Sequence, residues 1–399
     1  MVERAMDMLA VELAMDPADL RRRNLIAPDR FPHTTAGGAT YDSGDYEKAL
    51  DKLLELSSYK ELRADQAQRR KRGDRRQLGI GLAIYVEVTA MGIGPEWGAV
   101  RIETDGTATV RCGTTSFGQG HETSLAQIAA EELGMPMEAV RVIHSDTDAI
   151  ERGTGTVGSR SMQHGGSAVH QAAQQVRHKA RDLASHLLEA DPADIVFVRG
   201  TVGVAGVPDR SISWASLVAA AGERKNLPDG MEPGLAAESD FAGEGSFPFG
   251  AHCAVVEVDL ETGDARPVRF FAVDDCGRII NPLLAEGQVH GGIAQGIGQA
   301  MLEEVVFDDE GTPRTSSLVD YHIPSIGEIP QVVTATTETP SPNNPLGAKG
   351  IGESGTIGST PAIQNAVIDA VSHLGVRHID MPLTPERVWN ALAAARAKT

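Results

Sequence analysis

Aromatic residues, basic residues and cysteines are all scarce in this chain, and long apolar runs are missing. Only 4% of the residues are Phe, Trp or Tyr, so the cores must rely on Val, Ile, Leu and Ala. Lys and Arg number 36 against 55 Asp and Glu, which gives a net charge of −19. This balance argues against nucleic acid or an anionic membrane as a broad partner, because both attract basic surfaces.

The few cysteines and the lack of long apolar runs exclude further classes of protein. Cys112, Cys253 and Cys276 are far apart and odd in number, so they form no disulfide framework and no zinc or iron–sulfur spacing. No apolar run approaches the length that spans a membrane, and residues 1–15 resemble a helix with scattered charges more than a signal peptide. We therefore expect a cytoplasmic protein without a membrane span.

The hydrophobic pattern predicts an α+β fold in three successive parts. Residues 1–76 form a helical segment and linker, and residues 77–235 form a first part of hairpins and helices. A stretch rich in Gly, Pro and Glu over residues 226–250 marks a boundary. In residues 236–399 the same order of hairpin, Gly-rich loop and helix recurs, so we expect an architecture that is built twice.

Several helices have clear signals. Asp16 and Pro17 suit the N-cap and the first turn of a short helix. Residues 46–63 and 167–188 each predict one continuous helix. The basic stretch at residues 69–76 is interpreted as a solvated linker, in preference to a binding patch.

A first candidate ligand loop is Gly118-Gln119-Gly120-His121, directly before a predicted helix. Its glycines let backbone amides approach a ligand closely, and the N–H groups and dipole of the helix favour a phosphate or another anion. The Gln119 amide can both donate and accept hydrogen bonds. A simple tight turn is an equally good interpretation of this motif taken alone.

A second loop, residues 153–161, combines glycines and hydroxyl groups with one positive charge and suits a polyanionic or pterin-like ligand. It contains the pattern G-x-G-x-x-G, but polar residues precede it where a dinucleotide fold needs a strand. A structural Gly/Ser loop is the alternative. Its candidate binding residues are Thr156, Gly158, Ser159, Arg160 and Ser161.

The third motif runs from Cys276 through Arg278 to Asn281-Pro282 and continues into a predicted helix with many glycines. Each glycine weakens a helix by about 1 kcal/mol, so close packing must offset the cost of several glycines. Close packing against another helix alone is one interpretation of this motif, and glutamines on another face that reach a buried cofactor are the functional interpretation. The face expected to pack closely carries Gly287, Gly291, Ala294 and Gly298, and the glutamine face carries Gln288, Gln295 and Gln299.

The fourth motif, residues 344–355, carries Lys349, Gly350, Gly352 and Glu353. Glu353 is an acid among small residues at the start of a probable helix, where the backbone can position it as a general base. Stabilising the helix dipole is the more common role of an acid at such a place. The motif alone favours that second role.

In this order, the four motifs resemble the molybdenum hydroxylase family, the large subunits of xanthine dehydrogenases, aldehyde oxidases and carbon monoxide dehydrogenases. The first, second and third motifs resemble the family's molybdopterin-contacting loops, and residues 349–353 resemble the loop with its essential glutamate. The match extends over nearly the whole chain and corresponds to the C-terminal, molybdopterin-binding part. Each motif alone is weak, but jointly they are specific, and the style is nearest to the carbon monoxide dehydrogenase branch.

The resemblance implies a two-part α+β molybdopterin-binding domain of the aldehyde oxidase/xanthine dehydrogenase type. It implies a molybdenum–molybdopterin cofactor, in most bacterial members as the cytosine dinucleotide, with no metal ligand from the protein itself. The expected reaction hydroxylates an aldehyde, an N-heterocycle or carbon monoxide with water as the oxygen source. Glu353 is then the general base, and this role replaces the helix-dipole interpretation.

One departure from the family is large, because its subunit is much longer and the N-terminal half has no counterpart here. That half completes the substrate pocket and, in carbon monoxide dehydrogenases, carries a copper-bound cysteine whose loop Cys112 does not match. We therefore expect a heteromeric complex with a chain that supplies this half and with iron–sulfur and FAD subunits. The alternatives are a non-catalytic truncated or split chain and, on glycine patterns alone, a nicotinamide dehydrogenase.

Overall fold

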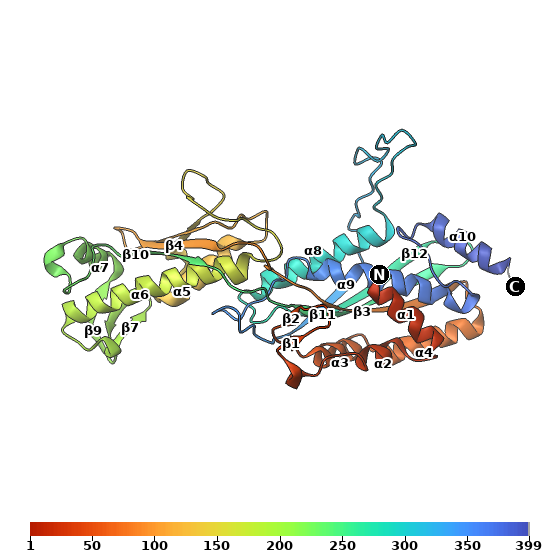
Figure 1. Cartoon of the computed structure of the whole chain (residues 1–399), viewed down its shortest axis with the longest axis horizontal. Helices are drawn as coiled ribbons and strands as arrows, with labels where there is room; N and C mark the ends of the chain where they lie inside the picture. Colours follow the sequence, from red (N-terminus) through yellow and green to blue (C-terminus); the bar gives the residue numbers. More distant parts are fainter. Residues whose placement is uncertain (398–399) are drawn as a thin grey trace.

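The computed structural model describes residues 1–397, which form two lobes side by side (Figure 1). Each lobe is built on its own four-stranded sheet, with strand order β10-β4-β5-β6 in the first and β13-β12-β11-β3 in the second. The strands of the first sheet are β4 (Glu96–Ile102), β5 (Ala108–Cys112), β6 (Val140–Ile143) and β10 (Ala236–Phe241). Those of the second are β3 (Arg76–Val86), β11 (Phe249–Asp259), β12 (Ala265–Asp275) and β13 (Gln331–Thr337).

The two sheets share a unit of three strands and one helix. In the first lobe the antiparallel pair β4 and β5 is followed by helix α5 (His121–Leu133) and by β6, which is parallel to β5. In the second lobe the antiparallel pair β11 and β12 is followed by helix α8 (Pro282–Met301) and by β13, which is parallel to β12. The expected repeat of the architecture is therefore confirmed.

Aliphatic side chains fill the core of the first lobe. Helix α6 (Ser167–Leu188) packs along β4 and β10 and buries Val169, Val176 and Leu183 against Val100 and Val110. A smaller sheet caps the outer end of this lobe (Figure 1). This cap consists of β7 (Ile195–Val198), β8 (Thr201–Val204), β9 (Val207–Ser213) and helix α7 (Trp214–Ala221).

The second lobe has three layers, with the sheet between two sets of helices (Figure 1). Strand β3 of this sheet needs glycine at Gly79 and Gly81, because a Cβ at either position would meet the backbone of the helix α9 (Ser354–Val371) that covers it. One side carries α8, α9 and α10 (Pro385–Arg396), and the other carries α3 (Tyr46–Leu56) and α4 (Tyr59–Arg72).

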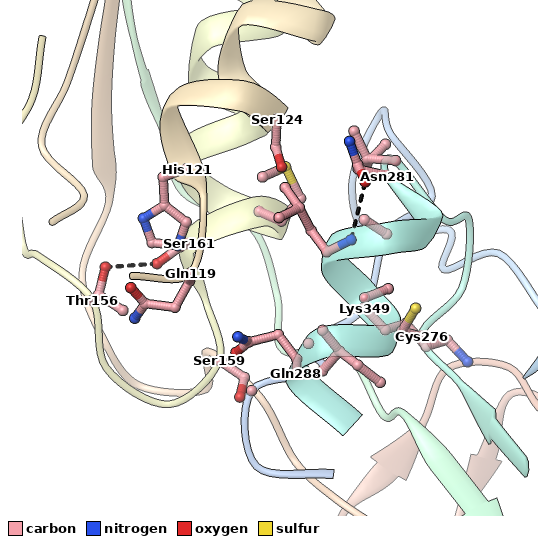
Figure 2. Close-up of a pocket in the computed structure, with 18 of the residues that line it drawn as sticks. Gln119, His121, Ser124, Thr156, Ser159, Ser161, Cys276, Asn281, Gln288 and Lys349 are labelled. Carbon is pink, nitrogen blue, oxygen red and sulfur yellow. Dashed lines mark hydrogen bonds between the residues drawn. The ribbon is translucent and has the colours of Figure 1, made fainter. Parts of the chain in front are cut away.

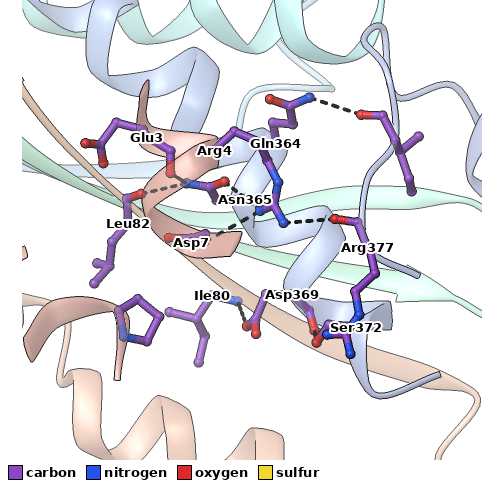
Figure 3. Close-up of polar contacts among 12 residues, drawn as sticks. Glu3, Arg4, Asp7, Ile80, Leu82, Gln364, Asn365, Asp369, Ser372 and Arg377 are labelled. Atoms are coloured by element: carbon purple, nitrogen blue, oxygen red, sulfur yellow. Dashed lines mark hydrogen bonds and ion pairs between the residues drawn. The ribbon is translucent and has the colours of Figure 1, made fainter. Parts of the chain in front are cut away.

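The N-terminal helix α1 (Val2–Glu12) is held onto the second lobe by buried polar contacts (Figure 3). Arg4 Nη1 donates to Asn365 Oδ1 at 2.9 Å, and Arg4 Nη2 donates to the Arg377 carbonyl at 3.0 Å. Asn365 in turn donates to the Leu82 carbonyl at 3.0 Å. Helix α2 (Pro17–Arg22) has Asp16 as its N-cap, as expected. Its Arg21 donates to the same Leu82 carbonyl at 3.1 Å.

Three sequence expectations differ from this architecture. Strand β3, placed in the first part, pairs with β11 in the second lobe, and β10, placed in the second part, pairs with β4 in the first. Residues 46–63 are not one helix, because Ser58 adopts a left-handed φ of 50° and separates α3 from α4. The basic stretch is not a solvated linker, because residues 69–72 form the last turn of α4. Arg69 also pairs with the second sheet, where its Nη1 lies 2.6 Å from Glu257 Oε1.

The chain between α8 and β13 extends away from both lobes as an irregular arm (Figure 1). A short hairpin, β1 (His33–Thr34) and β2 (Thr40–Tyr41), precedes α3. In the part of the chain that the structure describes, no helix has the length and apolarity that a membrane crossing requires.

Candidate active site

A cavity of about 300 Å³ lies where loops of the two lobes meet (Figure 2). The first lobe contributes the loop before α5 and the loop around residues 156–162. The second lobe contributes residues 276–281 after β12, the start of α8, and residues 348–353 before α9. Gln119 and Glu353, which are far apart in the sequence, line this same cavity, so the four motifs converge as expected.

Most residues proposed from the sequence line the cavity, and three do not. The glycines Gly118 and Gly120 adopt left-handed φ angles of 109° and 74° and shape the turn before α5 without themselves lining the cavity. Arg160 is the third. Those that line it are Gln119, His121, Thr156, Gly158, Ser159, Ser161, Asn281, Gln288, Lys349, Gly350, Gly352 and Glu353.

Arg160 has a different position from the one expected, because its side chain is fully buried behind the loop. It forms a close ion pair with Glu96, which is equally buried, and donates to the Gly94 carbonyl at 2.8 Å and the Gly155 carbonyl at 3.2 Å. The positive charge therefore fixes the loop to β4 and does not face a ligand.

The hydroxyl groups of this loop lie on the cavity wall (Figure 2). Thr156 Oγ1 donates to the Thr115 carbonyl at 2.6 Å and lies 2.8 Å from Ser161 Oγ. Beside them is His121, whose Nδ1 is buried and has no hydrogen-bond partner among the described residues. Burial, with a contribution from His144, lowers the pKa of His121, so its ring is neutral at neutral pH and can accept or donate one hydrogen bond there.

The two cations of the cavity wall differ in role. Lys349 is buried, and its ammonium group donates to the Ser43 carbonyl at 3.0 Å and lies 5.3 Å from the centroid of the Phe249 ring. Burial lowers the pKa of Lys349, against the charges of Asp42 and Asp275. Arg278 is exposed on the wall, so it, and not Arg160, presents a positive charge there. Sequence reasoning missed Arg278, although the third motif contains it.

Helix α8 contributes fewer ligand groups than expected. Gln288 lines the cavity, whereas Gln295 is exposed and Gln299 accepts a hydrogen bond from Thr360 at 2.9 Å. Asn281 lies at the N-cap of α8, where its Oδ1 accepts from the Leu284 N–H at 3.0 Å, as Figure 2 shows. Of the three glutamines on this face, only Gln288 therefore reaches the cavity.

The expected close-packing face of α8 is also wrong in detail. A Cβ at Gly287 or Gly291 would meet nothing within 4 Å. At Gly292 it would lie 2.8 Å from Gly355 Cα, and at Gly296 it would lie 3.0 Å from Thr360 N. The packing face is therefore rotated, and it brings α8 directly against the first turns of α9.

Glu353 is the N-cap residue of α9 and lines the cavity. Ser159 of the first lobe donates a close hydrogen bond to Glu353 Oε2. A Cβ at Gly350 would lie 2.5 Å from Ser159 Cβ, and one at Gly352 would lie 2.9 Å from Ser159 Oγ. Glycine at these two positions lets the loops of both lobes approach each other. Ser159 can therefore reach Glu353 and hold its Oε2 oxygen in place.

Apolar residues complete the wall, and the sequence motifs predicted few of them. Burial raises the pKa of the Cys276 thiol to about 12, so this thiol is neutral at physiological pH. In the described part of the chain, no group of three or more His, Cys, Asp or Glu side chains is arranged to hold a metal ion. The further wall residues include Phe117, Val157, Met162, Ile279, Ile280, Leu284 and Ile351.

Residues 52–330 match the model of the molybdopterin cofactor-binding domain. The chain belongs to the molybdenum hydroxylase large-chain family. It is 41% identical to the carbon monoxide dehydrogenase large chain of Hydrogenophaga pseudoflava, over 98% of this chain and 50% of that protein. It is 38% identical to subunit gamma of the 6-hydroxypseudooxynicotine dehydrogenase complex of Paenarthrobacter nicotinovorans, over 97% of this chain and 49% of that protein.

Solved structures confirm the fold of this molybdenum hydroxylase chain. Quinoline 2-oxidoreductase from Pseudomonas putida 86 superposes with a TM-score of 0.91 at 40% identity, covering 98% of this chain and 51% of that one. Carbon monoxide dehydrogenase from Oligotropha carboxidovorans superposes with a TM-score of 0.93 at 38% identity, covering 100% and 51%. The chain thus has the α+β molybdopterin-binding fold of this family and spans about half the length of the relatives that it matches.

Proposed function

We propose that this chain supplies the molybdopterin site and the general base of a molybdenum-dependent hydroxylase. The observation that carries the proposal is the position of Glu353, at a cavity where the loops of both lobes meet. The substrate class is an aldehyde, an N-heterocycle or carbon monoxide, since the relatives act on small molecules of more than one of these kinds, as their names state.

The cavity has the chemistry that a pterin with phosphate groups requires. Amides and hydroxyls that both donate and accept suit the ring edges of a pterin, and the site offers Gln119, Thr156, Ser161 and Gln288. Helix α5 starts beside the cavity without a side-chain cap, and the dipole at its N-terminus favours an anion there. The unpartnered Nδ1 of His121 is a further group for a ligand to satisfy.

When bound, the molybdenum cofactor supplies the redox chemistry of hydroxylation, with water as the oxygen source. The protein's own step is proton transfer, and Glu353, which lines the cavity, is placed to accept the proton on its carboxylate. Ser159 donates to Oε2 and so limits rotation of the carboxylate. We expect the cytosine dinucleotide form of the cofactor, whose extra phosphate would lie near the α5 N-terminus or Arg278.

In this proposal, partner subunits carry the electrons away and complete the large subunit. Electrons would leave through iron–sulfur and FAD subunits, and a further chain would supply the half of the large subunit that this chain does not match. The supporting observation is that the relatives named here are about twice as long, and that one of them is a subunit of a dehydrogenase complex. A non-catalytic role for the chain remains the alternative that the following experiment decides.

Replacing Glu353 with Gln in the assembled enzyme should keep the fold and the bound cofactor but nearly abolish turnover. The amide is close in shape but cannot accept a proton, and general-base catalysis contributes about a hundredfold to ten-thousandfold. Turnover, molybdenum and released cytidine nucleotide are measured on the same preparation. Glu131→Gln, an exposed position on α5, is the matched control. A Glu353→Gln enzyme with half of the normal kcat contradicts the assignment.

A further inference from the structure

Glu353 has a second carboxyl group beside it that no sequence motif includes. Glu87 directly follows β3, and its backbone N–H donates to the Pro248 carbonyl at 3.0 Å. The Glu87 side chain is half-buried and meets the Glu353 side chain both as a hydrogen-bond partner and as a like charge. Ser354 Oγ, on the first residue of α9, donates to Glu87 Oε2 at 3.5 Å.

A buried polar chain lies behind this pair. Tyr85 is within hydrogen-bonding reach of Ser354, and its hydroxyl donates to Asp274 Oδ1 at 2.5 Å. His252 Nε2 lies 2.9 Å from the same oxygen. Asp274 Oδ2 and His252 Nδ1 are buried without a hydrogen-bond partner among residues 1–397. Glu87 therefore faces Glu353 and Ser354 of α9, with Tyr85 of β3, Asp274 of β12 and His252 of β11 behind it.

The fold gives this carboxyl pair little freedom to separate. Glu87 is held by the pairing of β3 with β11, and Glu353 is held by α9 and by the hydrogen bond from Ser159. Two ionised carboxylates within hydrogen-bonding reach repel each other, and one proton between them removes the repulsion and adds a hydrogen bond. Burial, and then the charge of Glu353, raises the pKa of Glu87 to about 8.

We propose that Glu87 is a positioning residue for Glu353 and that the two side chains share one proton. The proposal rests on the proposed function of Glu353 as the base. In the resting pair the proton resides on Glu87, which donates a hydrogen bond to the Glu353 carboxylate. Ser159 donates to the same carboxylate from the first lobe. The Glu353 carboxylate thus accepts one hydrogen bond from each lobe, beside the cavity that it lines.

The proposal predicts a loss of activity on the alkaline side that the base alone does not explain. An unperturbed glutamic acid has lost its proton by pH 6, whereas Glu87 holds its proton until the pH rises through about 8. Above that pH the donor to Glu353 becomes a second negative charge. We expect kcat of the assembled enzyme to fall along an alkaline limb with an apparent pKa near 8, without a matching rise in KM.

Two substitutions separate a positioning role from a merely structural one. Glu87→Ala removes the donor, and we expect kcat to fall by about tenfold at neutral pH, the usual scale for a hydrogen bond to a charged group. Glu87→Gln keeps an N–H donor that cannot titrate, so it should recover most of the lost turnover and lack the alkaline limb. Glu131→Gln should keep the limb of the unaltered enzyme.

A readout without turnover uses infrared spectroscopy of the full 399-residue chain. The unaltered chain should show the C=O band of a protonated carboxylic acid that disappears as the pH rises through about 8. Glu87→Gln should lack this band, and Glu353→Gln should shift its loss to lower pH, because the neighbouring charge is gone. A Glu87→Gln variant with an unchanged band and an unchanged alkaline limb overturns the proposal, even where Glu353→Gln is inactive. An active Glu353→Gln enzyme instead overturns the proposed function.

Discussion

At the scale of single residues, the ion pair of Arg160 and Glu96 shapes the ligand loop from within the protein. Both side chains have no exposed surface, and Glu96 also accepts hydrogen bonds from the Trp97 N–H at 3.1 Å and the Thr154 N–H at 3.3 Å. Removing one partner of such a pair leaves a buried charge without compensation, which destabilises proteins by about 3–5 kcal/mol. We expect Arg160→Met to lower the free energy of unfolding by about this amount, as measured by urea denaturation.

A second variant tests whether the lost charge, and not the lost volume, causes that effect. Arg160→Met combined with Glu96→Gln removes both charges, and the glutamine oxygen can still accept from the Trp97 N–H. The double variant should be more stable than Arg160→Met alone, because no uncompensated charge remains. Equal destabilisation of the two variants would show that the ion pair is not what holds the loop.

At the scale of elements, helix α8 positions the start of α9 and therefore Glu353. A Cβ at Gly292 would lie 2.8 Å from Gly355 Cα and 2.9 Å from Thr356 N, on the turn that directly follows Glu353. We expect Gly292→Ala to lower the free energy of unfolding by about 1–3 kcal/mol through overpacking, and to lower kcat by displacing the base. Thermal unfolding and turnover of the assembled enzyme measure the two effects.

The neighbouring glycine provides the control for this prediction. A Cβ at Gly291 would meet nothing within 4 Å, so Gly291→Ala only removes the helix-weakening effect of glycine. It should raise the free energy of unfolding by up to about 1 kcal/mol and leave turnover unchanged. The same loss in both variants would mean that glycine matters here for helix flexibility and not for close packing.

The elements also show which parts of the fold the sequence can predict. Helix α6 spans residues 167–188 as expected, because its apolar periodicity is continuous over its whole length. The break at Ser58 was missed, although Ser58 and Glu61 have the S-x-x-E spacing that marks the start of a helix. Strand pairing across the lobes, such as β10 with β4, depends on contacts distant in sequence, which the local pattern does not contain.

For the site, local motifs predicted the loops but not the partners of each side chain. The convergence of Gln119, Ser159 and Glu353 on one cavity followed from the family resemblance of their motifs. The placement of Arg160 was missed because Glu96, which draws it inward, lies 64 residues earlier. Glu87 had no motif at all, and only the pairing of β3 with β11 brings it beside Glu353.

At the scale of the whole molecule, apolar side chains are exposed where the protein is expected to meet a partner. Phe117 lines the cavity and is 76% exposed, although a wall residue of an enclosed ligand site is normally buried. Val319 and Ile326 in the arm between α8 and β13 are 93% and 89% exposed. Large apolar side chains with this degree of exposure are candidates for contact with another protein chain.

We therefore expect the 399-residue chain, purified by itself and loaded with molybdenum cofactor, to bind the cofactor without turning over substrate. The cavity wall at Phe117 is uncovered, so water is not excluded from the reacting groups, and substrate is held from one side only. Light scattering should show self-association that rises with concentration and decreases when Val319 and Ile326 are replaced with Ser. Turnover is measured with an aldehyde or a purine and an artificial electron acceptor, which makes iron–sulfur and flavin subunits unnecessary. Robust oxidation in this assay would show that the two lobes described here form a complete active site, and that the exposed apolar residues serve another contact.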